Sequence, residues 1–174
     1  MLSKVKALIE LFHFTPLPIE KTLFSSTYRS EQELPGGGPV GTAMLGLYCH
    51  DPLSHSLFHK LPVDEIWHFY SGDPLQLMLL FPDGSSRKVI LGSDPLRGNQ
   101  VQFVIPAGTW QAGCMVEGGR YSLFGCTMAP GFTDTLFEGG VRESLLAKYP
   151  DQKAEIERFS CSADQTRMPE GFAS

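Results

Sequence analysis

The sequence predicts an all-β protein, a sandwich or barrel built from many short strands. Its 174 residues are enough to bury the core of one domain. The 18 glycines and 13 prolines are scattered along the chain, so they indicate many turns rather than one disordered segment. Between these turns lie short runs of β-branched, aromatic and aliphatic residues, such as Glu65–Tyr70, with the composition of strands. Short strands with turn signals at close intervals are typical of an antiparallel sandwich or barrel.

Helices are expected only near the two ends of the chain. Residues 2–12, Leu2 included, place apolar side chains on one face of a helix, with Ser3 as its N-cap. Residues 143–159 return to helical spacing, and Pro150 should divide them into two short helices. Strands are expected between these regions at residues 23–29, 42–49, 56–59, 65–70, 75–81, 87–91, 101–105, 111–115 and 122–128.

The chain reads as a single domain over residues 1–160, followed by a loosely ordered tail over residues 161–174. No internal repeat and no low-complexity linker indicates a second domain. Residues 30–38 include three consecutive glycines and are expected to form a surface loop, or a flap beside a site.

Composition excludes several classes of function. The net charge is -5 with no basic run, which argues against a nucleic-acid surface. No apolar run approaches the roughly 20 residues of a membrane span, and no signal peptide is evident. Cys49, Cys114, Cys126 and Cys161 are widely spaced, without a C-x-x-C pair. We therefore expect a reduced, cytoplasmic protein with buried cysteines and no structural disulfide.

The side chains best suited to acid–base chemistry lie in the stretch Phe58–Gly72. It reads as one strand ending near His59, a short bend, and a second strand beginning at Glu65. A carboxylate facing an imidazole across two strands would raise the imidazole pKa, fix its tautomer and make it a candidate general base. The alternative is a buried pair that only stabilises the core.

Alternation along residues 65–70 places Glu65, Trp67 and Phe69 on one face of the strand. If Glu65 faces a cavity, the two aromatic rings line that cavity. His68 then packs on the outside or at a dimer interface, and is more readily a structural histidine.

Two motifs resemble those of the cupin superfamily. His59, Glu65 and Gly72 have the layout of the first cupin motif, and Pro106–Gln111 resembles the second. The resemblance implies a double-stranded β-helix, or jelly-roll barrel, with the short N-terminal helix and the C-terminal helices outside it. It also implies a homodimer that pairs barrel edges, since unpaired edge strands favour such pairing.

A closer resemblance is to the cupin type five family, a domain of unknown function. Four segments carry it, in order: Thr27–Ser30, Asp64–Tyr70, Ile105–Ala112 and Gly125–Phe132. With the pattern around them they span about residues 5–150, nearly the whole domain.

The chain departs from the metal-binding cupin pattern. Leu57 stands at the position of the first histidine of that pattern, and Gln111 at the position of the last. Only His59 and Glu65 remain as strong ligands, whereas a transition metal generally takes three. We therefore expect no metal and no cofactor.

Further candidates for ligand binding flank these motifs. Arg29, beside Tyr28, could hold a carboxylate or phosphate, or simply form a surface ion pair. Trp110 offers a face for a sugar ring and Gln111 a donor and an acceptor, although both also suit a core. Upstream, residues 18–22 keep only the glutamate of the His-Pro-Glu-Gly-Gly sequence that family members often show.

The expected function is the binding of a small polar metabolite, of the sugar or nucleotide-sugar class, in the barrel. One alternative is a metal-independent sugar epimerase or isomerase with His59 as base and Tyr28 or Tyr121 as acid, by similarity to nucleotide-sugar 3,5-epimerases. Others are a metal-dependent dioxygenase or decarboxylase, and a binding module without catalysis.

Overall fold

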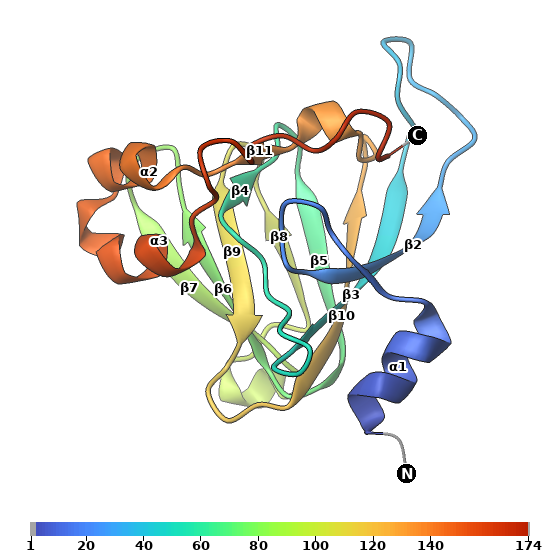
Figure 1. The fold of residues 1–174 in the computed structure, drawn as a ribbon, viewed down its shortest axis with the longest axis vertical. Helices are drawn as coiled ribbons and strands as arrows, with labels where there is room; N and C mark the ends of the chain where they lie inside the picture. Colours follow the sequence, from blue (N-terminus) through green and yellow to red (C-terminus); the bar gives the residue numbers. More distant parts are fainter. Residues whose placement is uncertain (1–2, 174) are drawn as a thin grey trace.

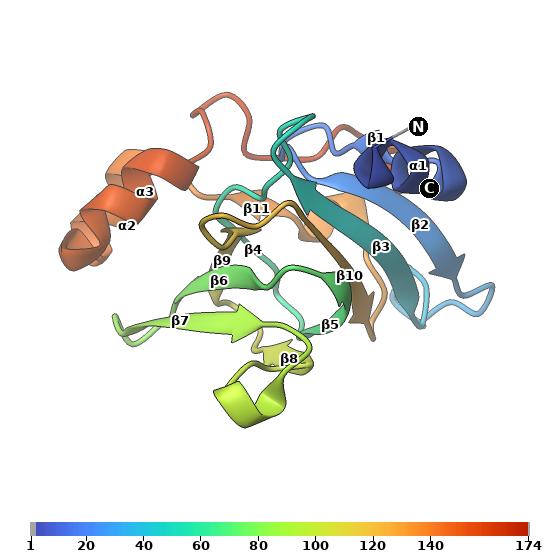
Figure 2. The same ribbon diagram turned by 90° about the horizontal axis from the view of Figure 1, so that it is seen from below.

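A computed structural model describes residues 3–173 as two antiparallel sheets that face each other (Figures 1 and 2). The six-stranded sheet has the order β1-β2-β3-β10-β5-β8, and the five-stranded sheet the order β11-β4-β9-β6-β7. The strands are β1 Thr15–Pro16, β2 Leu23–Arg29, β3 Thr42–Cys49, β4 His59–Lys60, β5 Glu65–Gly72, β6 Leu75–Leu80, β7 Ser86–Leu91, β8 Gln102–Ile105, β9 Trp110–Met115, β10 Tyr121–Met128 and β11 Glu138–Gly139. The predicted all-β class is confirmed. Leu2, expected in the first helix, and Ser174, expected in the tail, lie outside the described range.

The helices lie at the two ends of the chain, as expected. They are α1 Lys4–Phe12, α2 Arg142–Lys148 and α3 Lys153–Phe159, with short 3₁₀ turns at η1 Pro95–Arg97, η2 Asp134–Leu136 and η3 Pro150–Gln152. Ser3 caps α1, because its hydroxyl accepts a hydrogen bond from the backbone N–H of Lys6 at 3.3 Å. Pro150 begins the 3₁₀ turn that separates α2 from α3, which confirms the predicted division.

Most strands lie within one or two residues of the predicted bounds, but the strand expected at residues 56–59 does not. Only His59 and Lys60 join the ladder there. The residues just before them bond elsewhere: the N–H of Ser56 donates to Gly113 at 2.8 Å, and that of Phe58 to Phe159 at 2.6 Å. The segment therefore crosses from one element to another instead of following one partner strand.

Aromatic rings fill part of the space between the sheets. The Phe124 ring stacks on Trp67 with centroids 4.6 Å apart, and it contacts Tyr48 at the same centroid distance. Gly46 in β3 makes room for it, since a Cβ there would lie 2.3 Å from the Phe124 ring. Further apolar clusters lie beneath α1 and beneath α2 and α3.

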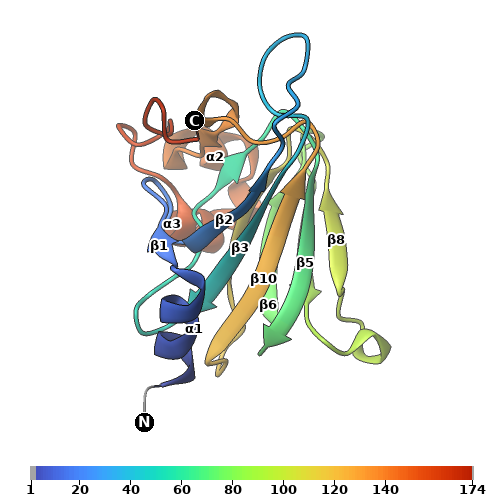
Figure 3. The same cartoon turned by 90° about the vertical axis from the view of Figure 1, so that its right-hand side faces the viewer.

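The six-stranded sheet contains two irregularities. The β2–β3 register shifts between Ser26 and Tyr28, and the β10–β5 register shifts between Leu123 and Phe124. An extra residue in one strand reverses which side chains beyond it face inward. In Figure 3, β2, β3, β10 and β5 run side by side across this sheet.

The segment that follows α3 lies along one end of the barrel (Figure 1). Cys161 and Met168 are buried, and the N–H of Gly139 donates to the carbonyl of Thr166 at 2.8 Å. Among residues 3–173, no helix has the length and apolar character needed to cross a membrane.

Candidate functional site

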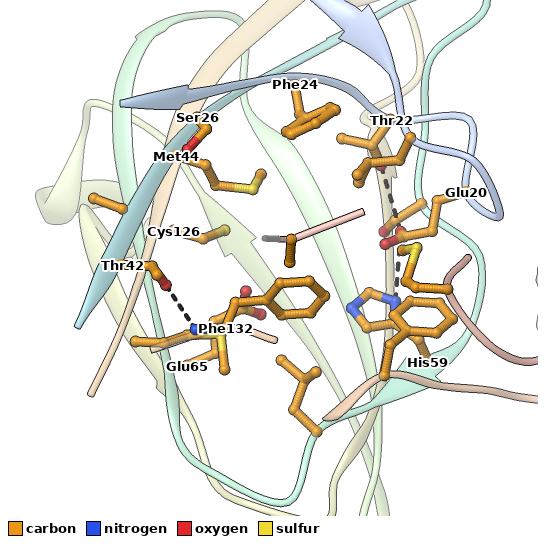
Figure 4. Close-up of a pocket in the computed structure, with 18 of the residues that line it drawn as sticks. Glu20, Thr22, Phe24, Ser26, Thr42, Met44, His59, Glu65, Cys126 and Phe132 are labelled. Atoms are coloured by element: carbon orange, nitrogen blue, oxygen red, sulfur yellow. Dashed lines mark hydrogen bonds and ion pairs between the residues drawn. The ribbon is translucent and has the colours of Figure 1, made fainter. Parts of the chain in front are cut away.

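A cavity of about 260 Å³ lies between the two sheets (Figure 4). Strands β2, β3, β5 and β10 of the larger sheet supply much of its wall, together with β4 and the segment after α3. Its aromatic and aliphatic lining residues include Leu17, Phe24, Met44, Leu61, Trp67, Phe124, Met128, Phe132, Phe137, Met168 and Phe172. Its polar lining residues are Glu20, Thr22, Ser26, Arg29, Thr42, Tyr48, Ser56, His59, Glu65 and Cys126.

His59, in β4, lies in the cavity wall with contacts on its ring face and at Nδ1. Its ring stacks on Phe137 with centroids 5.3 Å apart, and Nδ1 lies 2.8 Å from the carbonyl oxygen of Leu57. Because a carbonyl only accepts, Nδ1 carries the proton of the neutral ring. Burial lowers the pKa of His59, which keeps the ring neutral. Nε2 therefore carries a lone pair, and within residues 3–173 it has no hydrogen-bond partner.

Glu20 lies beside His59, with its Oε2 atom 3.4 Å from Nδ1 (Figure 4). The carboxyl also receives hydrogen bonds from the Thr22 hydroxyl, at 3.4 Å, and from the backbone of Leu57. Burial outweighs these bonds and raises the pKa of Glu20 to about 8. At neutral pH the pair is therefore a protonated acid beside a neutral imidazole, not an ion pair.

Glu65, at the start of β5, is the second buried carboxyl of the cavity. Its Oε2 accepts from Nε1 of Trp67 at 2.9 Å, and the same indole N–H lies 3.1 Å from Oε1 of Gln111. Burial raises the pKa of Glu65, and the charges and hydrogen bonds of His59, Trp67 and Gln111 offset only part of this effect. The nearby Cys126 thiol has its pKa raised by burial and by both carboxyls, so it stays protonated.

The structure brings together four of the residues singled out from the sequence. His59, Glu65, Trp67 and Arg29 all line the cavity. Gln111 does not line the cavity itself. It is buried, and its Oε1 atom accepts a hydrogen bond from Trp67, which does.

Three other candidates do not line this cavity. Tyr28 is 56% exposed, because the register shift in β2 turns it outward. Phe69 packs at the border of the central aromatic cluster. Trp110 packs towards α2 and α3, with Nζ of Lys60 4.6 Å from its ring centroid.

His68 lies on the outer face of β5, as the alternation predicts. Its Nε2 is 2.9 Å from the Thr127 hydroxyl, and its Nδ1 is 3.1 Å from the side-chain amide of Gln102. These contacts link His68 to β10 and β8 on the outer surface of the sheet.

Several cavity residues could not be singled out from the sequence pattern. Glu20 precedes β2 and belongs to no strand, although its presence in the family sequence before Tyr28 was a usable signal. Tyr48 is the tyrosine that lines the cavity, with its hydroxyl 2.8 Å from that of Ser56. Tyr121, considered as an acid, packs instead in the cluster beneath α1.

The donor set does not fit a metal ion. Among residues 3–173, no group of three or more His, Cys, Asp and Glu side chains is arranged to hold one. Two positions lack a free metal ligand. The Leu57 side chain cannot bind a metal and its carbonyl oxygen contacts Nδ1 of His59, while Oε1 of Gln111 accepts a hydrogen bond from Trp67.

Comparisons with known proteins agree with this fold. A family model described as "Cupin superfamily (DUF985)" matches residues 6–139. A protein of Shewanella oneidensis, SO0799, has a solved structure that is 31% identical, with a TM-score of 0.81 over 91% of this chain and 98% of that one. A hypothetical protein from Leishmania major is 26% identical, with a TM-score of 0.83 over 92% of this chain and 100% of that one.

A more distant structure supports the fold alone. A cupin 2 conserved barrel domain protein from Rhodopseudomonas palustris is 11% identical, with a TM-score of 0.55 over 83% of each chain. No curated protein matches this chain.

Proposed function

The chain belongs to the Cupin superfamily (DUF985), and on this premise we propose that the cavity between its sheets binds a small metabolite. One observation carries the proposal: the cavity keeps Glu20, His59 and Glu65 buried around an open space. Burying ionisable groups costs free energy, and a core that served stability alone would fill the space with apolar side chains. Such groups are instead typical of binding and catalytic sites.

The cavity restricts the size and shape of the ligand. About 260 Å³ is slightly below the usual range for sites of drug-sized ligands. A single sugar ring or a small acid suits this space better than an enclosed nucleotide sugar. The aromatic walls favour a ligand with at least one apolar face, and the C–H face of a sugar ring is one example.

Blocking the cavity tests this proposal. Ser26 lines the cavity from β2 and is exposed at its opening, so Ser26→Trp should fill the space without removing a buried contact. We expect some member of a panel of sugars, sugar phosphates and small aromatic acids to raise Tm of the wild type by about 5 °C at 100 times its Kd. Ser26→Trp should remove this shift.

Ser86→Trp is the matched control, because it places the same side chain on an exposed position of β7 in the other sheet. It should keep the ligand-induced shift. Shifts of equal size in both variants, or no stabilising compound in the panel, would contradict binding in this cavity.

A second candidate, metal-independent proton transfer, is favoured by the lone pair on Nε2 of His59. A neutral imidazole with one free nitrogen can remove a proton next to a carbonyl, and the protonated Glu20 beside Nδ1 holds the ring in place. Tyr48 lines the cavity and Tyr28 and Tyr121 do not, so Tyr48 replaces them as the candidate acid in this proposal.

Deuterium incorporation tests this second candidate. In deuterated water, the wild type should introduce deuterium at a carbon of any sugar that it epimerises, and His59→Gln should reduce the rate at least 100-fold. The Tm of the variant shows whether it is folded. Incorporation at the wild-type rate by folded His59→Gln would rule out His59 as the base.

The homodimer expected from the resemblance remains a prediction. Strand β8 is an edge of the six-stranded sheet, and Val104 there and Val101 just before it are 47% and 50% exposed. An apolar edge of this kind suits pairing with a second copy.

A further inference from the structure

A bulge at Thr27 turns Arg29 towards the cavity. In the β2–β3 ladder Ser26 pairs with Met44, whereas Tyr28 pairs with the very next residue along β3, so Thr27 is the extra residue. Without it, alternation from Ser26 would turn Tyr28 inward and Arg29 outward. The bulge reverses this order, and Arg29 lines the cavity while Tyr28 faces solvent.

Arg29 stands in the same cross-strand row as Glu65. The pairings run from Arg29 to Thr42, from Thr42 to Met128 and from Met128 to Glu65, and all four side chains line the cavity. At about 4.8 Å per step, three steps place the two outer Cα atoms at most about 14 Å apart. Glu65 lies buried at one end of the row and Arg29 lies exposed at the other, so one small molecule along the row can contact both.

The guanidinium of Arg29 has N–H donors that form no hydrogen bond within residues 3–173. One N–H, on NH1, donates to the carbonyl of Phe132 at 3.1 Å, and Arg29 makes no ion pair within residues 3–173. Among the described residues that line the cavity, it is the sole Lys or Arg. Neither buried carboxyl of the cavity, Glu20 or Glu65, forms an ion pair with Arg29, and burial raises the pKa of both.

We propose, on the premise that this cavity is the ligand site, that Arg29 selects a ligand with an anionic group. The ligand class is a small carboxylate or phosphate monoester whose apolar body lies against Phe24, Met44 and Trp67. The planar guanidinium fork binds such oxygens through paired, charge-assisted hydrogen bonds. The tether to Phe132 fixes its orientation at the edge of the cavity.

Calorimetric titration with three probes of similar size tests this selection. Phenyl phosphate and phenylacetate carry the two candidate anions, and benzyl alcohol is the neutral reference. The wild type should bind the better anion at least tenfold more tightly than benzyl alcohol, and the stronger of the two identifies the preferred head group. Arg29→Gln should lose this preference and keep the affinity for benzyl alcohol.

Arg97→Gln is the matched control, since Arg97 is 86% exposed in η1 and does not line the cavity. It should retain the anion preference. The role of Arg29 would be overturned if the wild type showed no preference for the anions, or if Arg29→Gln kept that preference. Either result would overturn it even if the wild type bound benzyl alcohol and Ser26→Trp did not. Anion binding that persists in Ser26→Trp would place the anion outside the cavity and overturn the inference as well. Failure of all three probes to bind the wild type would count against the cavity as a ligand site.

Discussion

Replacing Trp67 with phenylalanine should lower the free energy of unfolding by roughly 2–4 kcal/mol, because it leaves two buried acceptors without their donor. The indole N–H serves Oε2 of Glu65 at 2.9 Å and Oε1 of Gln111 at 3.1 Å. Phenylalanine can keep an aromatic contact with Phe124, so the loss comes chiefly from the missing donor. The same change should raise the pKa of Glu65 further, since the Trp67 hydrogen bond now lowers it.

Trp110→Phe provides the control, as the chain has just two tryptophans. Trp110 is half-buried and its indole N–H donates no hydrogen bond within residues 3–173, so its replacement should cost less than about 1 kcal/mol. Urea unfolding of both variants measures the difference, with the slope m checking that both fold to the same compactness. Equal losses in the two variants would show that the shared N–H is not what stabilises this part of the core.

The fold could be predicted because its signals are local. Alternating side chains in strands such as β5, and turn residues between strands, occur within a few residues of one another. The predicted strand at residues 56–59 failed because Ser56 and Phe58 bond to Gly113 and Phe159, which are distant in sequence. A local sequence pattern cannot predict hydrogen-bond partners that are distant in the sequence.

The candidate site was predictable to the extent that it follows strand alternation. Glu65 and Trp67 face the cavity because they are two residues apart in β5. Tyr28 and Arg29 illustrate the limit, because their orientations depend on an extra residue, Thr27, that no composition rule identifies. Both are assigned correctly only once the pairing with β3 is known.

The contribution of the C-terminal segment to the cavity wall could not be predicted from the sequence either. Phe172 lines the cavity, and its ring centroid lies 5.5 Å from that of Phe24. The segment around Phe172 carries weak patterning, so its composition does not indicate a wall of the cavity. The contact arises from the path of the chain over the end of the barrel.

The cavity holds a protonated Glu20 beside a neutral His59, and the pH dependence of stability tests these protonation states. In the unfolded chain a glutamate ionises near its ordinary value of 4.5, whereas in the folded protein Glu20 keeps its proton up to about pH 8. Between these values the folded state binds more protons than the unfolded state. The contribution of Glu20 to stability is therefore complete below pH 4.5 and is lost as the pH rises to about 8.

Several other groups titrate in or near this window, among them His55, whose pKa is lowered to about 4 by burial, and His68, whose pKa burial also lowers, so the comparison must isolate Glu20. The pKa of Glu65 is raised and acts in the same direction. The pKa of His59 is lowered, so its contribution is lost as the pH falls below 6.5. All of these groups remain in Glu20→Gln, which replaces the carboxyl by a neutral group of the same shape.

The decisive measurement is the free energy of unfolding of the wild type and of Glu20→Gln at pH 5 and pH 8, by urea denaturation. Relative to Glu20→Gln, the wild type should lose on the order of 3 kcal/mol between the two pH values. A wild type that instead gains stability relative to Glu20→Gln as the pH rises would show an ionised Glu20 paired with a charged His59. That result would contradict the neutral pair, and with it the free lone pair of His59 in the cavity.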